Sequence, residues 1–266
     1  MRYALLRTCK QVALAAATVC AVALAGQGTG SADEAGAKAM VKAMSDFLAG
    51  QKNISAKYNT ELEIVTPSIE KITFSSTGEL TLSRPDKIHA TRTGGYADVE
   101  LFFDGKTFSL YGKHVNSYVR VEVPGMVDNL IDVLREKHGA QLPFADLLLS
   151  KPYDVLMDGV LEAKDVGRGV IDGVECEHLA FRAFDTDWQL WVQTGPQPVP
   201  RQYIITSKTI AGAPQYRIRL TEWKTDAAPA SAAFTFKPPE GAKLVAADAI
   251  KEFDELPPPA ETQGKK

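Results

Sequence analysis

Hydrophobic and polar side chains alternate along most of this chain, and a period of two predicts β-strands with one buried and one solvated face. The alternation runs through residues 58–66, 70–92 and 97–123, and it returns at 160–192 and 200–225. The pattern therefore predicts roughly six antiparallel strands in the first half of the chain and roughly five in the second half.

Turn-forming residues divide these runs into hairpins. Asp104-Gly105 stands between two apolar runs, and this dipeptide favours a two-residue type I′ turn. Further turns are predicted at 112–116, 167–169 and 172–173, and at Asp185-Thr186-Asp187 within a strongly apolar hairpin.

A helical period of apolar residues replaces the alternation at two places. Residues 33–51 carry one apolar stripe behind an acidic start, which predicts a helix. Residues 126–140 repeat the pattern and predict a second helix that ends with Gly139 as the C′ residue. Residues 142–159 predict two short helices, with Pro143 and Pro152 suited to their first turns.

Strand-rich segments on both sides of a helical stretch, about 124–159, predict an α+β fold. We expect one strongly curved antiparallel sheet, an unclosed half-barrel, with helices covering its concave face. A single domain over 33–250 is expected to follow an N-terminal signal at 1–32. The proline-rich polar segment 251–266 is predicted to be a disordered tail.

The first 32 residues have the features of a secretory signal peptide. Arg2, Arg7 and Lys10 precede an uncharged apolar run at 12–25, and small residues follow it. A run of this length is short for a bilayer span, which needs about 20 residues. We therefore expect export to the periplasm with cleavage of the signal, and not an integral membrane protein.

Composition excludes some partners. Loss of the three positive charges in 1–32 lowers the formal net charge from −3 to −6. A mildly acidic exported protein lacks the clustered lysine and arginine that nucleic acids require, and it has no net attraction to anionic lipid. Cys9 and Cys20 leave with the signal, so Cys176 has no internal disulfide partner and is expected to be a small buried residue.

No catalytic motif is visible in the sequence. His89, His114, His138 and His178 are scattered without zinc-ligand spacing, and there is no nucleophile elbow or phosphate loop. Glu-Cys-Glu-His at 175–178 looks like a set of metal ligands, but strand alternation sends the two acids to one face and Cys and His to the other. We expect no metal, no cofactor and no enzymatic activity.

Several stretches of the chain resemble a family of predicted periplasmic proteins of unknown function. They include SRPDKIHATR at 83–92, LPFADLLLSKPYDVLM at 142–157 and GVIDGVECEHLAFRAFDTDWQLWV at 169–192. The layout is also similar to the outer-membrane lipoprotein carrier and receptor superfamily. That resemblance implies an unclosed antiparallel barrel with a helical lid and a hydrophobic cavity for acyl chains, and it implies no catalytic residues.

These observations suggest a non-enzymatic periplasmic binding protein that shelters a lipid or a lipoprotein acyl chain. The alternatives are an envelope structural or interaction protein with a filled core and no ligand, and, least favoured, a hydrolase with an unrecognised site. The expected partners are a lipid or acyl chain and an envelope protein, but not nucleic acid. Strand parity selects the candidate ligand-binding residues, which are Leu62, Ile64, Phe74, Leu80, Leu82, Phe103, Phe108, Leu110, Leu179, Phe181, Trp188, Leu190, Ile218 and Leu220.

Overall fold

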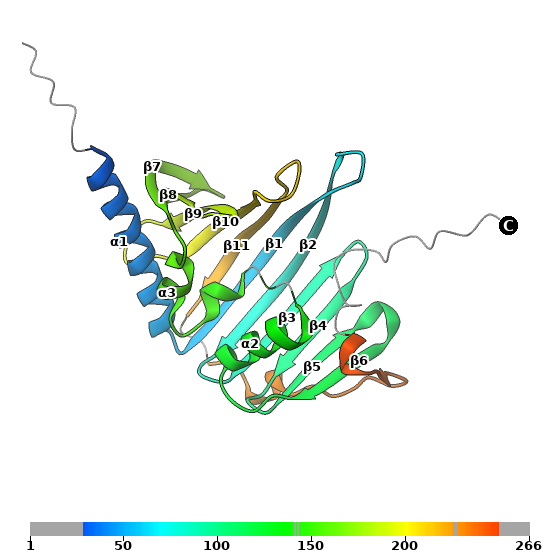
Figure 1. Cartoon of the computed structure of the whole chain (residues 1–266). Helices are drawn as coiled ribbons and strands as arrows, with labels where there is room; N and C mark the ends of the chain where they lie inside the picture. The colour runs from blue at the N-terminus through cyan, green and yellow to red at the C-terminus, as the bar shows by residue number, and fades with distance from the viewer. Residues whose placement is uncertain (1–28, 141, 143, 226–227, 250–266) are drawn as a thin grey trace, which may run out of the picture.

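A single curved sheet dominates the computed structural model, which describes residues 29–140, 142, 144–225 and 228–249 (Figure 1). Within these residues twelve strands pair in the order β12-β6-β5-β4-β3-β2-β1-β11-β10-β9-β8-β7. All neighbours are antiparallel except β12 and β6, which are parallel. The two ends of the sheet do not meet, so the predicted α+β half-barrel is confirmed.

The strands follow the predicted sequence of hairpins, with β1 to β6 before the helical stretch and β7 to β11 after it. Their bounds are β1 Asn53–Val65, β2 Lys71–Ser83, β3 Lys87–Gly94, β4 Asp98–Phe103, β5 Thr107–Gly112, β6 Ser117–Glu122, β7 Glu162–Ile171, β8 Val174–Arg182, β9 Thr186–Gln193, β10 Pro200–Ser207, β11 Gln215–Lys224 and β12 Lys243–Leu244. The predicted signal peptide, apart from its last residues, and the predicted tail lie outside the described residues.

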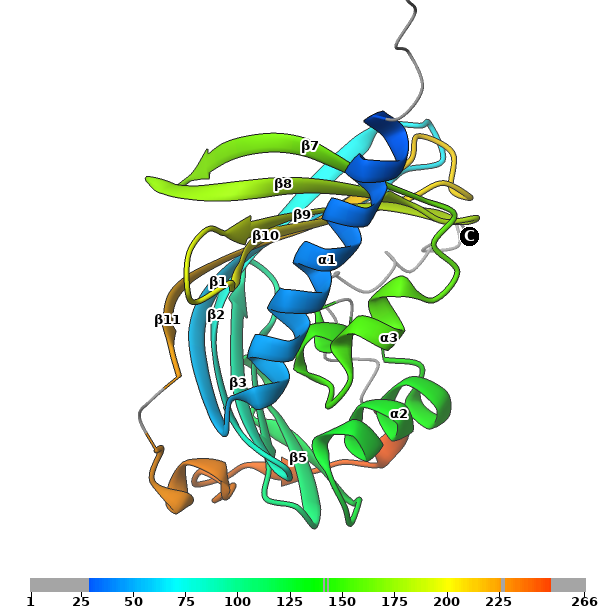
Figure 2. The same cartoon turned by 90° about the vertical axis from the view of Figure 1, so that its left-hand side faces the viewer.

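Helices cover the concave face (Figure 2). They are α1 Thr29–Gly50, α2 Val127–His138 and α3 Pro152–Met157, with 3-10 turns η1 Lys113–Val115, η2 Ala145–Leu148 and η3 Ser231–Phe234. The helices predicted at 33–51 and 126–140 are confirmed, although α1 begins before Asp33. Of the two short helices predicted at 142–159, the second is α3, whereas the first is the 3-10 turn η2, and Pro143 lies outside the described residues. Gly139 ends α2 in the left-handed conformation, where the N–H groups of Gly139 and Ala140 donate to the carbonyls of Arg135 and Leu134.

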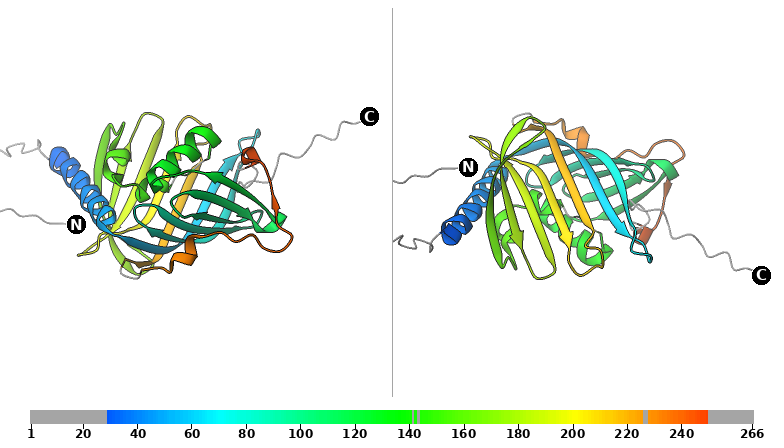
Figure 3. Two further views of the ribbon diagram at one scale, coloured as in Figure 1. Left: turned by 90° about the horizontal axis from the view of Figure 1, so that it is seen from below. Right: turned by 90° about the horizontal axis from the view of Figure 1, so that it is seen from above.

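Each long helix buries one apolar stripe against the sheet. Viewed from above and below, the sheet curves around the helices, with α1 along the end formed by β7 to β9 (Figure 3). The stripe of α1 is fully buried and consists of Ala37, Val41, Met44 and Leu48. The stripe of α2 consists of Val127, Leu130, Ile131 and Leu134.

The predicted turn at Asp104-Gly105 is present but has a different geometry. Asp104-Gly105 is not a type I′ turn, because only Gly105 has a positive φ and the connection has three residues. The Asp104 carboxylate instead accepts the N–H groups of Lys106 and Thr107. The type I′ requirement of two positive φ angles is met at Asp172-Gly173, where φ is 50° and 79°.

The predicted turn at 167–169 is absent because β7 continues through it with a β-bulge between Asp165 and Gly167. The Asp165 carboxylate accepts the Gly167 N–H, and the Asp33 carboxylate of α1 accepts the Asp165 N–H. The turn predicted at 185–187 lies slightly earlier, since Thr186 already belongs to β9.

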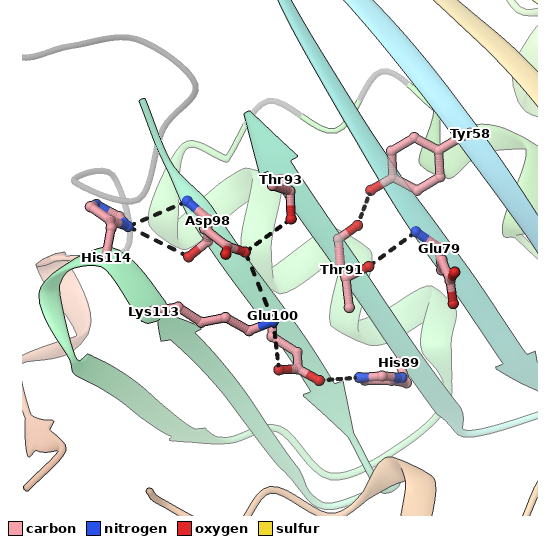
Figure 4. Close-up of polar contacts among 9 residues, drawn as sticks. All are labelled: Tyr58, Glu79, His89, Thr91, Thr93, Asp98, Glu100, Lys113 and His114. Carbon is pink, nitrogen blue, oxygen red and sulfur yellow. Dashed lines mark hydrogen bonds and ion pairs between the residues drawn. The ribbon is translucent and has the colours of Figure 1, made fainter. Parts of the chain in front are cut away.

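Gly78 on β2 allows the Tyr58 ring of β1 to lie over β2 and reach β3. The Tyr58 hydroxyl donates to the Thr91 carbonyl at 2.6 Å, and the Thr91 hydroxyl oxygen accepts the Glu79 N–H at 3.1 Å (Figure 4). A Cβ atom at Gly78 would overlap the Thr91 carbonyl and lie 2.5 Å from the Tyr58 hydroxyl oxygen. The close approach of β1 and β3 side chains and backbone therefore depends on Gly78.

We predict that Gly78→Ala lowers the free energy of unfolding by about 1–3 kcal/mol, because the added methyl group forces the Tyr58 ring or β3 to move. Denaturant unfolding followed by circular dichroism measures this change. Gly95→Ala is the matched control, since a Cβ atom there meets nothing within 4 Å. Equal stability of the two variants would contradict the proposed packing.

Candidate functional site

Strand register places all of the candidate ligand-binding residues on the concave face. Leu62 lies opposite Phe74 in the β1–β2 pair, and Leu179 lies opposite Leu190 in the β8–β9 pair. The register between the other neighbouring strands places the remaining candidates on this same face of the sheet. Choosing alternate residues along each predicted strand therefore identified one continuous surface of the sheet.

Burial divides this surface into two parts. Ten of the candidates are buried and belong to the core: Leu80, Leu82, Phe103, Phe108, Leu179, Phe181, Trp188, Leu190, Ile218 and Leu220. Within this group the rings of Phe181 and Trp188 stack at 3.8 Å, and Tyr203 meets Trp188 edge-on at 5.9 Å. The β8–β9 hairpin thus packs against the protein's own interior.

The other four candidates remain partly exposed. Leu62, Ile64 and Phe74 lie near the β1–β2 turn, and Leu110 lies on β5. In Figure 1 the end of the β1–β2 hairpin extends beyond the helices, which explains why apolar side chains there are less covered. Ile72, which lies opposite Ile64, is exposed as well.

A hollow of about 420 Å³ lies beside Phe74 at this end of the sheet. We call it the β2–β4 hollow, and its lining residues are Thr73, Phe74, Ser75, Ser76, Arg92, Gly94, Gly95, Tyr96 and Ala97. Several of these are exposed, so the hollow opens to solvent. At its inner side the hydroxyl groups of Thr60 and Ser76 form a buried hydrogen bond of 2.5 Å.

Arg92 is the charged residue in this lining, and the sequence analysis did not select it. Register places Arg92 opposite Gly78 and Val99, on the same face as Ile88 and Ala90. The same strand parity that selected the apolar candidates could have found it. The signal in the sequence was a positively charged residue on the β3 face that also carries Ile88 and Ala90.

The outer face of β3 to β5 carries a polar network (Figure 4). His89 Nε2 lies 2.8 Å from Glu100 Oε1, and Lys113 Nζ lies 3.4 Å from the other oxygen of Glu100. The Thr93 hydroxyl donates to Asp98 at 3.1 Å. These groups interact with one another on the outer surface of the sheet.

The four residues at 175–178 have separate environments. Arg168 bridges Glu175 and Glu177 at 2.8 Å and 3.0 Å. Cys176 is fully buried, and burial raises the pKa of its thiol, which disfavours the reactive thiolate. His178 stacks on Trp191 at 4.0 Å. Among the described residues, no group of three or more His, Cys, Asp or Glu side chains could hold a metal ion.

The described part of the chain contains no helix that is both long enough and apolar enough to cross a membrane.

Solved structures that are remotely similar to this chain include the following three. The lipoprotein LppX of Mycobacterium tuberculosis is 11% identical, with a TM-score of 0.46, and the match covers 74% of this chain and 98% of that one. LprF of Mycobacterium bovis is 14% identical, with a TM-score of 0.47 and coverage of 79% and 99%. A chain of the Pseudomonas aeruginosa MucA/MucB complex is 13% identical, with a TM-score of 0.40, and the match covers 76% of this chain and 61% of that one. A search of the curated proteins gives no match.

A family model described as "Predicted periplasmic protein (DUF2092)" matches residues 37–247. The match runs from α1 to the end of the described strands and includes all of the candidate residues. It confirms both the family resemblance and the periplasmic location predicted from the sequence. The chain belongs to the DUF2092 family of predicted periplasmic proteins.

Proposed function

We propose that this periplasmic protein is a non-enzymatic binding protein that holds a small amphipathic lipid in the β2–β4 hollow. The observation that carries the proposal is an open hollow on the apolar concave face with one charged side chain, Arg92, in its lining. Phe74, Tyr96 and Ala97 supply apolar contacts beside it. Ligand sites in proteins commonly combine an apolar wall with a few polar groups that fix the orientation of the ligand.

The volume limits the ligand. Small-molecule sites span about 300–1,000 Å³, and the 420 Å³ of this hollow is near the lower end. Each buried methylene contributes about 0.8 kcal/mol, so even a short acyl segment provides measurable affinity. The size favours a single acyl chain over a lipid with several chains, because α1 and α2 fill most of the remaining concave face.

Arg92 favours an anionic head group. A guanidinium presents five N–H donors in a planar fork that matches carboxylate and phosphate oxygens. Arg92 also interacts within the protein, and its several donors allow it to keep such a contact while it binds a head group. We therefore infer a fatty acid or a single-chain phospholipid as the ligand class.

The second candidate function is an envelope structural or interaction protein without a ligand. The observation that favours it is the burial of most of the predicted lining, including Phe181 and Trp188, in a packed core. A protein of this kind would work through its outer surface, and a purified sample would contain no lipid.

We predict that Phe74→Ser weakens binding of a dansyl-labelled fatty acid about tenfold, because roughly 1.4 kcal/mol of apolar contact is lost from the hollow. Fluorescence titration of protein purified from the periplasm gives the dissociation constant, and mass spectrometry of its lipid extract identifies natural ligands.

Leu110→Ser is the matched control for Phe74→Ser, since Leu110 is also a partly exposed residue of the concave face but lies outside the hollow. Its affinity is expected to match the wild type. Equal loss in both variants would place the site elsewhere, and saturating probe without any binding would favour the ligand-free alternative.

For Arg92→Gln we expect about tenfold weaker binding of the carboxylate probe and unchanged binding of the corresponding alcohol, because only the carboxylate uses the guanidinium. Arg92→Lys is expected to restore part of the affinity. Parallel loss for the acid and the alcohol would mean that Arg92 shapes the hollow without recognising a head group.

A further inference from the structure

Four neighbouring segments at one end of the sheet each expose a large apolar side chain. We call these residues the apolar rim, and their exposed fractions are Leu161 65%, Phe184 87%, Ile210 50% and Ile69 67%. Leu161 directly precedes β7, Phe184 lies in the β8–β9 turn, Ile210 in the β10–β11 turn and Ile69 in the β1–β2 turn. Exposed apolar residues of this size in successive turns mark an interaction site better than single scattered ones do.

Contacts between the segments show that the rim is a continuous row. The Leu161 N–H donates to the Arg182 carbonyl at 2.7 Å, and the Lys208 N–H donates to the Asp185 carbonyl at 2.8 Å. Lys71 Nζ donates to the Ala213 carbonyl at 3.5 Å, which connects the β1–β2 and β10–β11 hairpins. The turns of these two hairpins project side by side in Figures 1 and 2.

The backbone holds Ile69 outward at a cost. Ile69 has a φ of 62°, in the left-handed region that β-branched residues rarely adopt. The turn is fixed by hydrogen bonds from the Ile69 N–H to the Thr66 carbonyl and from the Thr66 N–H to the Glu70 carbonyl, each 2.9 Å. Backbone strain of this kind clusters at functional sites.

Three ion pairs lie beside the rim. Lys71 pairs with Glu63 at 3.0 Å, Lys208 with Asp187 at 3.1 Å, and Arg182 with Glu162 at 3.1 Å. Glu70 and Asp185, next to Ile69 and Phe184, add two negative charges, so the rim is mildly acidic and does not attract an anionic partner. Its complement is a surface that is neutral overall and accepts apolar groups.

The opposite end of the sheet also exposes large apolar side chains, Met126 and Val170, but these lie outside its turns. Its turns include Asp104 to Lys106, Asp172-Gly173 and 194–198, none of which exposes a large apolar side chain. The β2–β4 hollow, by contrast, opens near the apolar rim, since Tyr96 and Thr73 lie at the same end of the strands as the β1–β2 turn.

We propose that the apolar rim inserts into the surface of a zwitterionic phospholipid bilayer. The four side chains project singly from turns and form no groove, so each can partition independently between headgroups and acyl chains. The paired charges beside them suit a net-neutral headgroup layer. This orientation places the mouth of the hollow at the membrane surface, but the inference does not depend on a ligand in the hollow.

The test is flotation of the periplasm-purified protein with phosphatidylcholine vesicles. Wild-type protein is expected to float with the vesicles and to do so equally at low and high salt. The double variant with Phe184→Ser and Ile69→Asn is expected to bind at least tenfold more weakly. Asparagine tolerates positive φ, so this variant is expected to melt no lower than the wild type, and its affinity for the fatty-acid probe is expected to stay unchanged.

Met126→Ser is the control, because Met126 is an exposed apolar residue outside the rim. Absence of wild-type flotation would overturn the proposal, as would equal loss with Met126→Ser. Binding that requires anionic phosphatidylglycerol and disappears in salt would also overturn it. Sedimentation that shows a dimer in the wild type but a monomer in the double variant, without vesicle binding, would assign the rim to a second copy of the chain.

Discussion

The pairing of β1 with β11 is the constraint on which the rest of this structure depends. It joins two meanders of hairpins, one before the helical stretch and one after it, into a single sheet. Loop closure must bring strands from distant parts of the chain together before their contacts stabilise them. The concave face exists only once this pair has formed, because it is continuous from Phe103 on one side to Leu190 on the other.

Coverage of that face then decides what the protein can bind. α1 and α2 bring two narrow apolar stripes to a surface that is wider than both together, and they bury the parts that lie beneath them. The β1–β2 hairpin is long and extends past the helices, so Leu62, Ile64 and Phe74 remain partly open. Any ligand of the concave face must therefore use the part of the sheet that the helices leave uncovered.

Periodicity alone was sufficient to predict the sheet, the helices and the shared face of the fourteen candidate residues. It could not predict which of them face a ligand, because the burial of Trp188 or Leu82 depends on helices that are distant in sequence. Turn geometry was also beyond reach: Asp104-Gly105 and Asp172-Gly173 are the same dipeptide, yet only the second adopts two positive φ angles. At Asp104 the carboxylate caps two backbone N–H groups and selects a longer loop. Arg92 was missed because apolar character guided the choice of residues.

An unclosed sheet leaves β7 as an exposed edge strand, and free edges invite pairing with other chains. The bulge in β7 interrupts its regular ladder, while Asp165 and the Asp33 carboxylate of α1 occupy two of its N–H groups. A second molecule meets a bent, partly capped edge with negative charges beside it. The half-barrel can therefore remain open while its β7 edge offers a poor template for pairing with another chain.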